Sequence, residues 1–357
     1  MASAATYKSV RRSVPREVKV SLATGEAHFV ISTSCHQYED HIQHYEDTWD
    51  WKDLVVPEAD LVEFDEELGR GTYGVVVRGT LKGRDVAVKR GLEMRQTGNR
   101  RVVKREIAIL ATLARQDPQH EHVCRFLGVV FAPNNGPAKL IFELCNGGNL
   151  HSLLRDVRQR VKLTGAREWR SESFFRFSWG HRHAVLRQVA EALQHLHSLS
   201  IVHRDLKCSN VLLLNPVLDS DGSVAQTPVA KITDVGLARM AQTRRTGVMT
   251  PLATWEAAKH PWMAPELATS DFGSAADIYA WGCLAFQVIT LRGFWISAPW
   301  ELAACGRLPG PMALLMQAAQ PDQAARPTAA EVLARLGPVS EAVGEGIQVW
   351  LERDGSN

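Results

Sequence analysis

Two short segments of the chain carry side chains that could handle a phosphate. The first reads His-Arg-Asp-Leu-Lys-Cys-Ser-Asn over residues 203–210, and Asp-Val-Gly follows 24 residues later at 234–236. Asp205 and Asp234 supply two carboxylates and Asn210 supplies an amide, at offsets that can hold a metal-bound phosphate beside a hydroxyl nucleophile. This pattern indicates phosphoryl transfer, provided that the other parts of such a site lie in the right order.

A glycine-rich turn precedes these segments, at the start of a strand-rich region. Gly69, Gly71 and Gly74 follow the spacing Gly-x-Gly-x-x-Gly between two expected strands. Glycine has no Cβ, so the backbone can close over a phosphate and its N–H groups can donate to the phosphate oxygens. The spacing alone is a weak signal, because glycine-rich turns between strands are frequent.

A lysine and a glutamate come next along the chain. Lys89 ends the run Val86-Ala87-Val88, which predicts a strand whose lysine points into the space beneath the turn. A partly buried ammonium needs a partner, and Glu106 lies beside the apolar stripe of a helix expected over residues 99–115. We expect the two to pair; the alternative is that Glu106 is a solvent-facing helix charge.

In this order the motifs resemble those of eukaryotic protein kinases. The series continues with Ala264-Pro265-Glu266, with Asp-Ile-Tyr-Ala-Trp-Gly at 277–282 and with Arg326-Pro327. The resemblance covers residues 61–336 and implies an α+β, bilobal fold. Its small N-lobe would hold a five-stranded antiparallel sheet and one helix, and its larger C-lobe would be mainly helical. Lys207 and the sequence before Glu266 are most similar to the tyrosine-kinase-like group of serine/threonine kinases.

The resemblance implies transfer of phosphate from ATP, with Mg²⁺, to serine or threonine hydroxyls of protein substrates. Asp205 is expected to orient the acceptor hydroxyl and to take its proton. Lys207 would neutralise charge on the transferred phosphoryl group. Lys89 would contact the α and β phosphates, held in place by Glu106.

The same resemblance assigns metal-binding and bracing roles. Asn210 and Asp234 are expected to bind Mg²⁺. Glu266 and Arg326 would form a buried ion pair in the larger lobe. Asp277 would hold the segment at 203–210 from below.

The adenine site is expected between the lobes. Phe142 would be the gatekeeper, and residues 143–145 the hinge that reads adenine through backbone groups. For Val76, Ala87 and Leu212, ordinary core packing would explain the residue types equally well. The residues expected around the nucleotide are Gly69, Gly71, Gly74, Val76, Ala87, Lys89, Glu106, Phe142, Glu143, Cys145 and Leu212.

Two positions depart from the family pattern. Val235 replaces the usual phenylalanine after Asp234, which should loosen packing in the active arrangement because a buried aromatic ring contributes several kcal/mol. Lys259 stands where a threonine that contacts Asp205 is common. The alternatives to an active kinase are therefore a pseudokinase or scaffold that binds nucleotide without efficient turnover and a small-molecule kinase of similar fold.

Four regions are expected along the chain: an N-terminal extension over 1–60, an N-lobe over 61–143, a C-lobe over 144–340 and a tail over 341–357. Within the extension, the first 16 residues read as a basic tail. Alternating residues at 17–34 predict a hairpin. An acidic linker follows, in which Trp49 and Trp51 are expected to pack on the next domain as a strap.

The six cysteines are scattered without a CxxC pair, which is typical of reduced thiols in a cytoplasmic protein. The basic N-terminus leaves organelle targeting as an alternative. The longest apolar run, 278–291, is too short to cross a bilayer.

A formal net charge of +2 gives no case for nucleic-acid binding by the whole chain. Basic and aromatic residues do gather at 155–182, where nucleic-acid contact competes with the plainer interpretation of an insertion docked on the C-lobe. A zinc site at residues 35–44 is disfavoured by its spacing. An upstream kinase would act on the segment 234–266; the candidate acceptors there are Thr243, Thr246, Thr250 and Thr254.

Overall fold

The computed structural model divides into two compact units, Met1–Asp50 and Trp51–Asn357. The division falls earlier than the boundary expected at residue 60, because the residues from 52 onward pack with the second unit. The residues that the structure describes are 7–10, 18–21, 27–28, 52–71, 74–90, 97–116, 118–131, 138–163, 177–219, 226–235, 239–240, 261–268, 272–291, 310–340 and 342–345.

The first unit holds a small antiparallel sheet of three strands. β2 (Val18–Ser21) pairs with β3 (Ala27–His28), within the range where alternating residues predict a hairpin. β1 (Tyr7–Val10) pairs with β2 along its whole length. The tail expected there therefore contains a strand, because Tyr7 and Val10 bracket a short run that can extend the hairpin.

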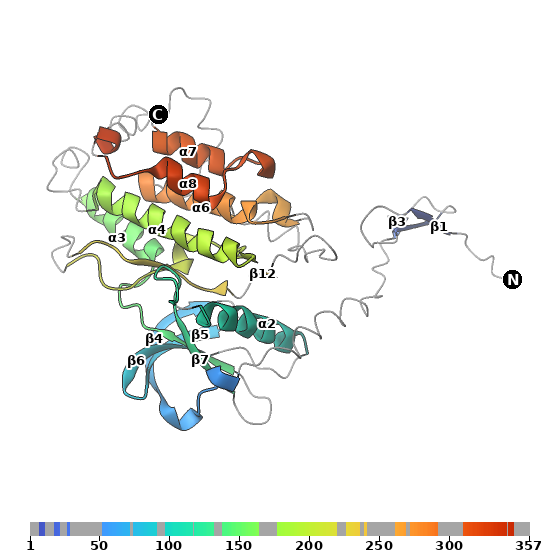
Figure 1. Ribbon diagram of the computed structural model, residues 1–357, viewed down its shortest axis with the longest axis vertical. Helices are drawn as coiled ribbons and strands as arrows, with labels where there is room; N and C mark the ends of the chain where they lie inside the picture. The colour runs from blue at the N-terminus through green and yellow to red at the C-terminus, as the bar shows by residue number, and fades with distance from the viewer. Residues whose placement is uncertain are drawn as a thin grey trace. The chain divides into compact units, whose positions relative to one another are not determined.

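The second unit begins with the five-stranded antiparallel sheet expected from the motifs (Figure 1). Its order is β4-β5-β6-β8-β7, and helix α2 (Thr97–Ala114) contacts β7. In β6 the side chains alternate, with Val86 and Val88 buried on one face. The strand bounds are β4 (Leu61–Gly71), β5 (Gly74–Leu81), β6 (Arg84–Arg90), β7 (Phe126–Phe131) and β8 (Ala138–Glu143).

The segment at residues 52–60, called the strap below, lies along β7. It contains two 3₁₀ turns, η1 (Lys52–Leu54) and η2 (Glu58–Asp60), and Val56 N–H donates to the Val129 carbonyl at 2.9 Å. Gly128 permits this approach: a Cβ there would lie 2.6 Å from Val56 Cγ2. The two tryptophans expected to anchor such a strap lie outside the described residues.

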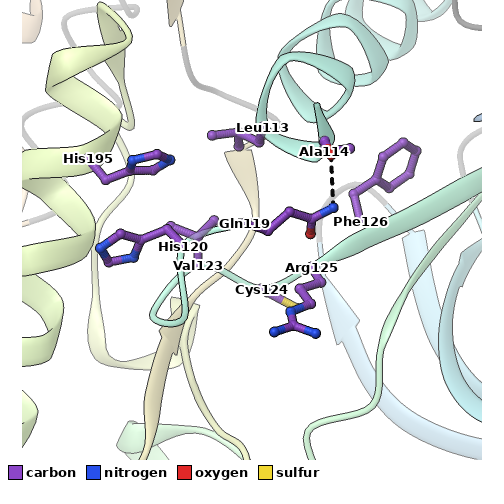
Figure 2. Close-up of a pocket in the computed structure, with 9 residues that line it drawn as sticks. All are labelled: Leu113, Ala114, Gln119, His120, Val123, Cys124, Arg125, Phe126 and His195. Carbon is purple, nitrogen blue, oxygen red and sulfur yellow. Dashed lines mark hydrogen bonds between the residues drawn. The ribbon is translucent and has the colours of Figure 1, made fainter. Parts of the chain in front are cut away.

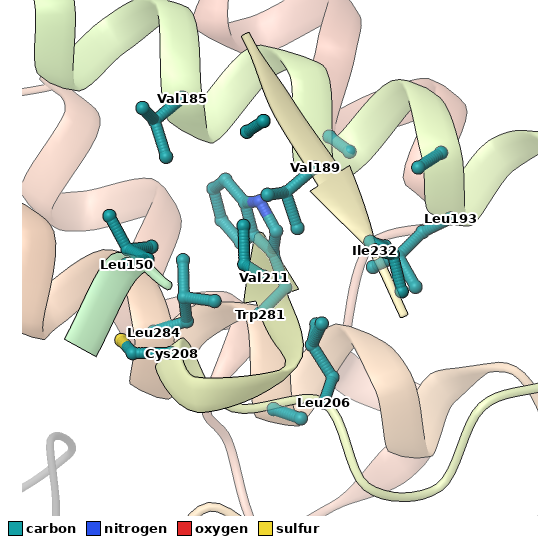
Figure 3. Packing of buried hydrophobic residues seen from close by; sticks show 14 of the residues in the cluster. Leu150, Val185, Val189, Leu193, Leu206, Cys208, Val211, Ile232, Trp281 and Leu284 are labelled. Carbon is teal, nitrogen blue, oxygen red and sulfur yellow. The ribbon is translucent and has the colours of Figure 1, made fainter. Parts of the chain in front are cut away.

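The larger lobe is built around α4, which contacts both α6 and α8, while α6 also contacts α7. Trp281 of α6 is fully buried and donates its indole N–H to the Leu186 carbonyl of α4 at 3.1 Å. Figure 3 shows the Trp281 ring among apolar side chains from both helices and from neighbouring short strands. The helix bounds are α3 (Leu150–Leu163), α4 (Trp179–Ser198), α6 (Ala275–Thr290), α7 (Gly310–Ala318) and α8 (Ala329–Leu336).

Short elements of the larger lobe carry the residues of interest. β10 (Val211–Leu213) pairs with β11 (Ala230–Ile232), and β9 (Ile201–Val202) pairs with β12 (Arg239–Met240). The 3₁₀ turn η5 (Cys208–Asn210) leads directly into β10. The α+β bilobal arrangement expected from the motifs is thereby confirmed.

The basic and aromatic segment at 155–182 is described at its two ends. Phe177 is 1% exposed in the main hydrophobic core, and Trp179 packs against that core from the start of α4. These contacts support docking of the insertion on the C-lobe, whereas Trp169, Phe174 and Phe175 lie outside the described residues. In the described part of the chain, no helix combines the length and apolarity that a membrane crossing requires.

Candidate active site

Lys89 connects the sheet to both other parts of the candidate site. Its Nζ lies 2.7 Å from Glu106 Oε1 and 3.1 Å from Asp234 Oδ1. β6 pairs with β5 on one side and with β8 on the other, so the lysine backbone is fixed on both sides. Burial alone would lower the Lys89 pKa, but the two carboxylates raise it overall, so the ammonium stays charged. The expected pairing of Lys89 with Glu106 is present.

Asp234 occupies an uncommon backbone conformation. Its φ is 65°, in the left-handed region that non-glycine residues rarely adopt. Burial would raise its pKa, but the Lys89 ammonium and other nearby cations lower it overall, which keeps the carboxylate ionised. Val235 beside it is 4% exposed and belongs to the main hydrophobic core. A strained, ionised carboxylate at the edge of a packed core is typical of a functional position.

Asp277 organises the segment 203–210 from beneath. Its Oδ2 accepts from the His203 backbone N–H at 2.8 Å and lies 2.9 Å from His197 Nε2, while Oδ1 accepts from the Arg204 backbone N–H at 2.8 Å. The side chain is completely buried. Burial would raise its pKa, but His197 and these hydrogen bonds lower it overall. The contacts expected between Asp277 and the segment 203–210 are present.

Asp205 lies at the centre of the loop and is 6% exposed. Its Oδ2 accepts from Lys207 Nζ at 2.6 Å and from Asn210 Nδ2 at 3.1 Å. Asn210 Nδ2 also donates to the Asp205 carbonyl at 2.8 Å, so the amide oxygen of Asn210 is turned away from Asp205. The structure thus brings these three predicted residues together.

The expected nucleotide residues lie on elements from both lobes. Ala87 of β6 pairs with Phe142 of β8, whose ring lies 5.6 Å from that of Phe126. Leu212 lies in β10 of the larger lobe and forms a bridge to Asn149. Half-buried side chains on facing elements are what the walls of an interlobe site require. The half-buried members of the set are Val76, Ala87, Phe142, Glu143, Cys145 and Leu212.

The glycine-rich turn closes the β4–β5 hairpin. Gly71 pairs with Gly74, whose φ of 138° favours glycine, and Gly69 pairs with Val76. A Cβ added at Gly69 would meet no atom within 4 Å. The backbone there borders open space that a phosphate could use.

The ion pair expected between Glu266 and Arg326 is present. Arg326 Nη2 lies 3.0 Å from Glu266 Oε2, its Nη1 contacts Oε1, and the arginine side chain is fully buried. The guanidinium also donates to the Ala275 and Pro321 carbonyls, at 2.9 Å each, and lies over the Tyr279 ring. This many partners compensate for the desolvation of a buried guanidinium.

Comparison with known proteins shows the family of the chain. Residues 62–295 match the model of the protein tyrosine and serine/threonine kinase family. The chain belongs to this family. The match spans both lobes and includes each motif of the site except Arg326.

Individual relatives are receptor-like and serine/threonine kinases. The kinase is 31% identical over 63% of its length to the receptor protein kinase WSS1 of Oryza sativa subsp. japonica. It is 27% identical over 67% of its length to the RasGEF domain-containing serine/threonine-protein kinase X of Dictyostelium discoideum. It is 31% identical over 64% of its length to cysteine-rich receptor-like protein kinase 28 of Arabidopsis thaliana. The chain spans only 22%, 21% and 29% of these three relatives.

The structure adds a residue that the motifs do not indicate, Lys231 of β11. Its Nζ lies 2.9 Å from Glu143 Oε1 and donates to the Glu121 carbonyl at 2.6 Å, and the side chain is 4% exposed. Glu143 Oε1 also accepts from the Arg125 backbone N–H at 2.8 Å. The lysine therefore fixes the side chain of the last residue of β8, where the hinge is expected. The signal in the sequence is a lone lysine within the apolar strand at 229–232.

A second junction joins the loop after α2 to helix α4 (Figure 2). His120, from the loop after α2, stacks on His195 of α4, with 4.8 Å between ring centroids. The two rings line a small cleft with room for about one water molecule, next to Gln119, whose Nε2 donates to the Ala114 carbonyl. Burial, together with the neighbouring histidines, lowers the pKa of His120 to about 4.

Several expected positions lie outside the described residues. They are the threonine candidates of the segment 234–266, Lys259, and the cysteine and histidines at 35–44. Their roles stay predictions. In the described part of the kinase, no group of three or more histidine, cysteine or carboxylate side chains could hold a metal ion.

Proposed function

We propose that the protein transfers the γ-phosphate of ATP, with Mg²⁺, to serine or threonine hydroxyls of protein substrates. The observation that carries this proposal is that Lys89 contacts Glu106 and Asp234 while Asp205 contacts Lys207 and Asn210. The two groups are neighbours, because the Lys207 cation helps to lower the pKa of Asp234. These residues come from four segments of the chain, namely β6, α2, the loop at 203–210 and the residues after β11. Structural packing alone gives no reason to place so many charges together.

The side chains and backbone at the site are suited to bind both Mg²⁺ and the phosphates of ATP. Asp234 and Asn210 offer a carboxylate and an amide oxygen, which are hard oxygen donors of the kind that Mg²⁺ prefers. The open space at Gly69 leaves room for phosphates against backbone N–H groups. When bound, the cation would neutralise part of the phosphate charge.

Each side chain would have a separate role in phosphoryl transfer. Lys89, held by Glu106, would bind and orient the nucleotide phosphates. Asp205 would orient the acceptor hydroxyl and accept its proton as the oxygen attacks the γ-phosphorus. Lys207, 2.6 Å from Asp205, would stabilise charge on the phosphoryl group as it leaves ADP.

Substrate class and regulation extend this proposal. Lys207 two residues after Asp205 favours serine or threonine acceptors, and the tyrosine-kinase-like group remains our assignment within the family. Arg204 is 3% exposed beside Asp205 and lies over the Phe272 ring at 4.8 Å. A cation near the segment 234–266 supports control by phosphorylation of that segment by an upstream kinase, with Thr246 and Thr250 as the preferred sites. We place this activity in the cytoplasm.

The test is transfer of labelled phosphate from Mg-ATP to the protein itself and to casein, followed by mass spectrometry of the acceptor residues. We expect incorporation on serine or threonine, reduced to a small residual rate in Asp205→Asn. Nucleotide binding, measured as a rise in melting temperature, should persist in that variant. Binding without any turnover by the wild type would instead indicate a pseudokinase, and labelling of tyrosine alone would overturn the substrate class.

A further inference from the structure

Trp262 touches the catalytic aspartate, a contact that no motif predicts. Its indole Nε1 donates to Asp205 Oδ1 at 3.3 Å. The other oxygen, Oδ2, already accepts from Lys207 and Asn210. Each carboxylate oxygen therefore has a donor, and the donor on Oδ1 comes from a different segment of the chain.

The same indole also contacts the second catalytic side chain. Lys207 Nζ lies over the Trp262 ring, 5.6 Å from its centroid, in a cation–π arrangement. Lys207 is 28% exposed, so the ring is one of the few features that limit its motion. One side chain thus borders both the proposed base and the proposed phosphoryl-binding cation.

Trp262 is itself held firmly. Met263, Ala264 and Leu267, just after it, are buried in a cluster with Tyr279 and others, and Trp262 packs on this cluster. On the other side, the Cys283 thiol lies 3.6 Å from the Pro261 carbonyl. Two residues beyond Ala264 the chain is anchored through Glu266 by buried Arg326. The indole therefore presents its N–H from a rigid support.

We propose that Trp262 is a positioning residue, which fixes the Asp205 carboxylate and the Lys207 ammonium so that Asp205 Oδ1 faces the acceptor hydroxyl. This inference rests on the proposed function. A hydrogen bond to Oδ1 restricts rotation of the carboxylate, and a misplaced base costs rate even when substrates still bind. The residue acts through Asp205 and Lys207 and does not need to touch the transferred phosphate.

The kinetic test replaces Trp262 by phenylalanine, which keeps a ring beneath Lys207 and removes the N–H. We expect kcat for casein to fall about 10- to 100-fold while KM for ATP stays within about twofold. Trp281→Phe is the matched control, because it also removes an indole hydrogen bond, but from the core away from the site. A fall in kcat no larger than that of Trp281→Phe would overturn the positioning role.

Two further measurements separate positioning from simple loss of packing. In the Asp205→Asn background, Trp262→Phe should have no further effect on the residual rate, whereas a packing defect would add its own loss. Installing 3-benzothienylalanine at position 262, which has the shape of tryptophan without the N–H, should reproduce the fall in kcat. Activity restored to the wild-type value by this isostere would contradict the inference.

A spectroscopic test does not depend on turnover. The ten indole N–H resonances of the ¹⁵N-labelled protein can be resolved, and Trp262→Phe identifies one of them by its loss. Asp205→Ala should shift that same resonance and speed its exchange with water. An unmoved resonance would refute the contact. If the contact is found but the wild type transfers no phosphate, the proposed function fails and the positioning role fails with it, while the contact stands.

Discussion

Lys231 and Glu143 form an ion pair across the two lobes, with 2.9 Å between Nζ and Oε1. Lys231 belongs to β11 of the larger lobe and Glu143 ends β8 of the smaller one. Glu143 is the first residue of the expected hinge, and Lys231 restrains its side chain. This pair connects the end of β8 to β11, the strand that precedes Asp234.

Replacing Lys231 by methionine should therefore weaken nucleotide binding without removing a catalytic group. Loss of one partner of a mostly buried pair leaves a desolvated carboxylate. We expect unfolding free energy to fall by about 2 kcal/mol and KM for ATP to rise several-fold, with kcat within about twofold. Denaturant unfolding and steady-state kinetics measure the three quantities. Lys82→Met, which removes an exposed pair with Asp60, should change none of them.

Asp277→Asn should damage the loop more than the nucleotide site. Asparagine has one acceptor oxygen and an NH₂ that would face a backbone N–H of the loop. We expect kcat to fall at least about 100-fold and unfolding free energy to fall by about 3 kcal/mol, with nucleotide affinity retained. Asp322→Asn is the matched control, because asparagine also caps a helical turn and the site lies in an exposed loop. If Asp277→Asn and Asp322→Asn lost kcat and unfolding free energy equally, the result would argue against the bracing role.

The ionised state of Asp277 also sets a pH limit. Its pKa in the folded protein is lowered, so the stability that it contributes is present above the ordinary aspartate value of about 3.9 and is lost as pH falls through the folded value. Acid denaturation curves should shift toward neutral pH when Asp277 is removed.

His120 predicts a different pH dependence, at milder acidity. Because its folded pKa is about 4 and the unfolded value is near 6.5, the folded state binds fewer protons between these values. The free energy of unfolding is therefore greatest above pH 6.5 and declines as pH falls toward 4. The side chain is only half buried, so we expect a loss of about 1 to 2 kcal/mol between pH 7.5 and pH 5.

Urea unfolding at the two pH values measures this loss. His120→Gln cannot be protonated and should reduce the difference in stability between pH 7.5 and pH 5. His151→Gln changes an exposed histidine at the start of α3 and should leave that difference as it is in the wild type. A pH dependence that is the same in all three proteins would show that the histidine stack does not cause it.

Replacing glycine by alanine should reduce stability at Gly147 but not at Gly69. At Gly147 a Cβ would lie 2.2 Å from the Asn215 carbonyl oxygen, so the backbone must shift, and we expect a stability loss of about 2 kcal/mol or more. At Gly69 nothing lies within 4 Å, and stability should change by less than about 0.5 kcal/mol. KM for ATP should nevertheless rise in Gly69→Ala, since the methyl group enters the space proposed for phosphates. Thermal melts and kinetics distinguish these outcomes.

Most of the candidate site could be predicted from the sequence, because its residues are unusual for their surroundings. A lysine closing an apolar strand and an aspartate within a loop both demand partners, and the order of the motifs supplies them. The apolar run at 278–291 lies almost entirely within helix α6, Ala275–Thr290. The catalytic and binding roles themselves remain predictions for the experiments above.

The contacts that escaped prediction depend on segments that meet only in the folded chain. In the sequence, Lys231 is a single charge in a short strand, and nothing there indicates that it pairs with Glu143. In the sequence, Trp262 is part of a motif, and nothing there indicates that its indole N–H donates to Asp205. The stack of His120 on His195 joins loop and helix residues with no shared pattern. Periodicity reports which face of an element is buried, but it does not report which polar group lies opposite.

The strap has a consequence for where the catalytic unit begins. β7 is the outer strand of its sheet on the side of α2, and the strap places residues 55 and 56 against it. Unpaired strand edges are sites where separate molecules join and aggregate. A fragment cut to start at Leu61 would keep every residue proposed for the chemistry and still expose this edge to other chains.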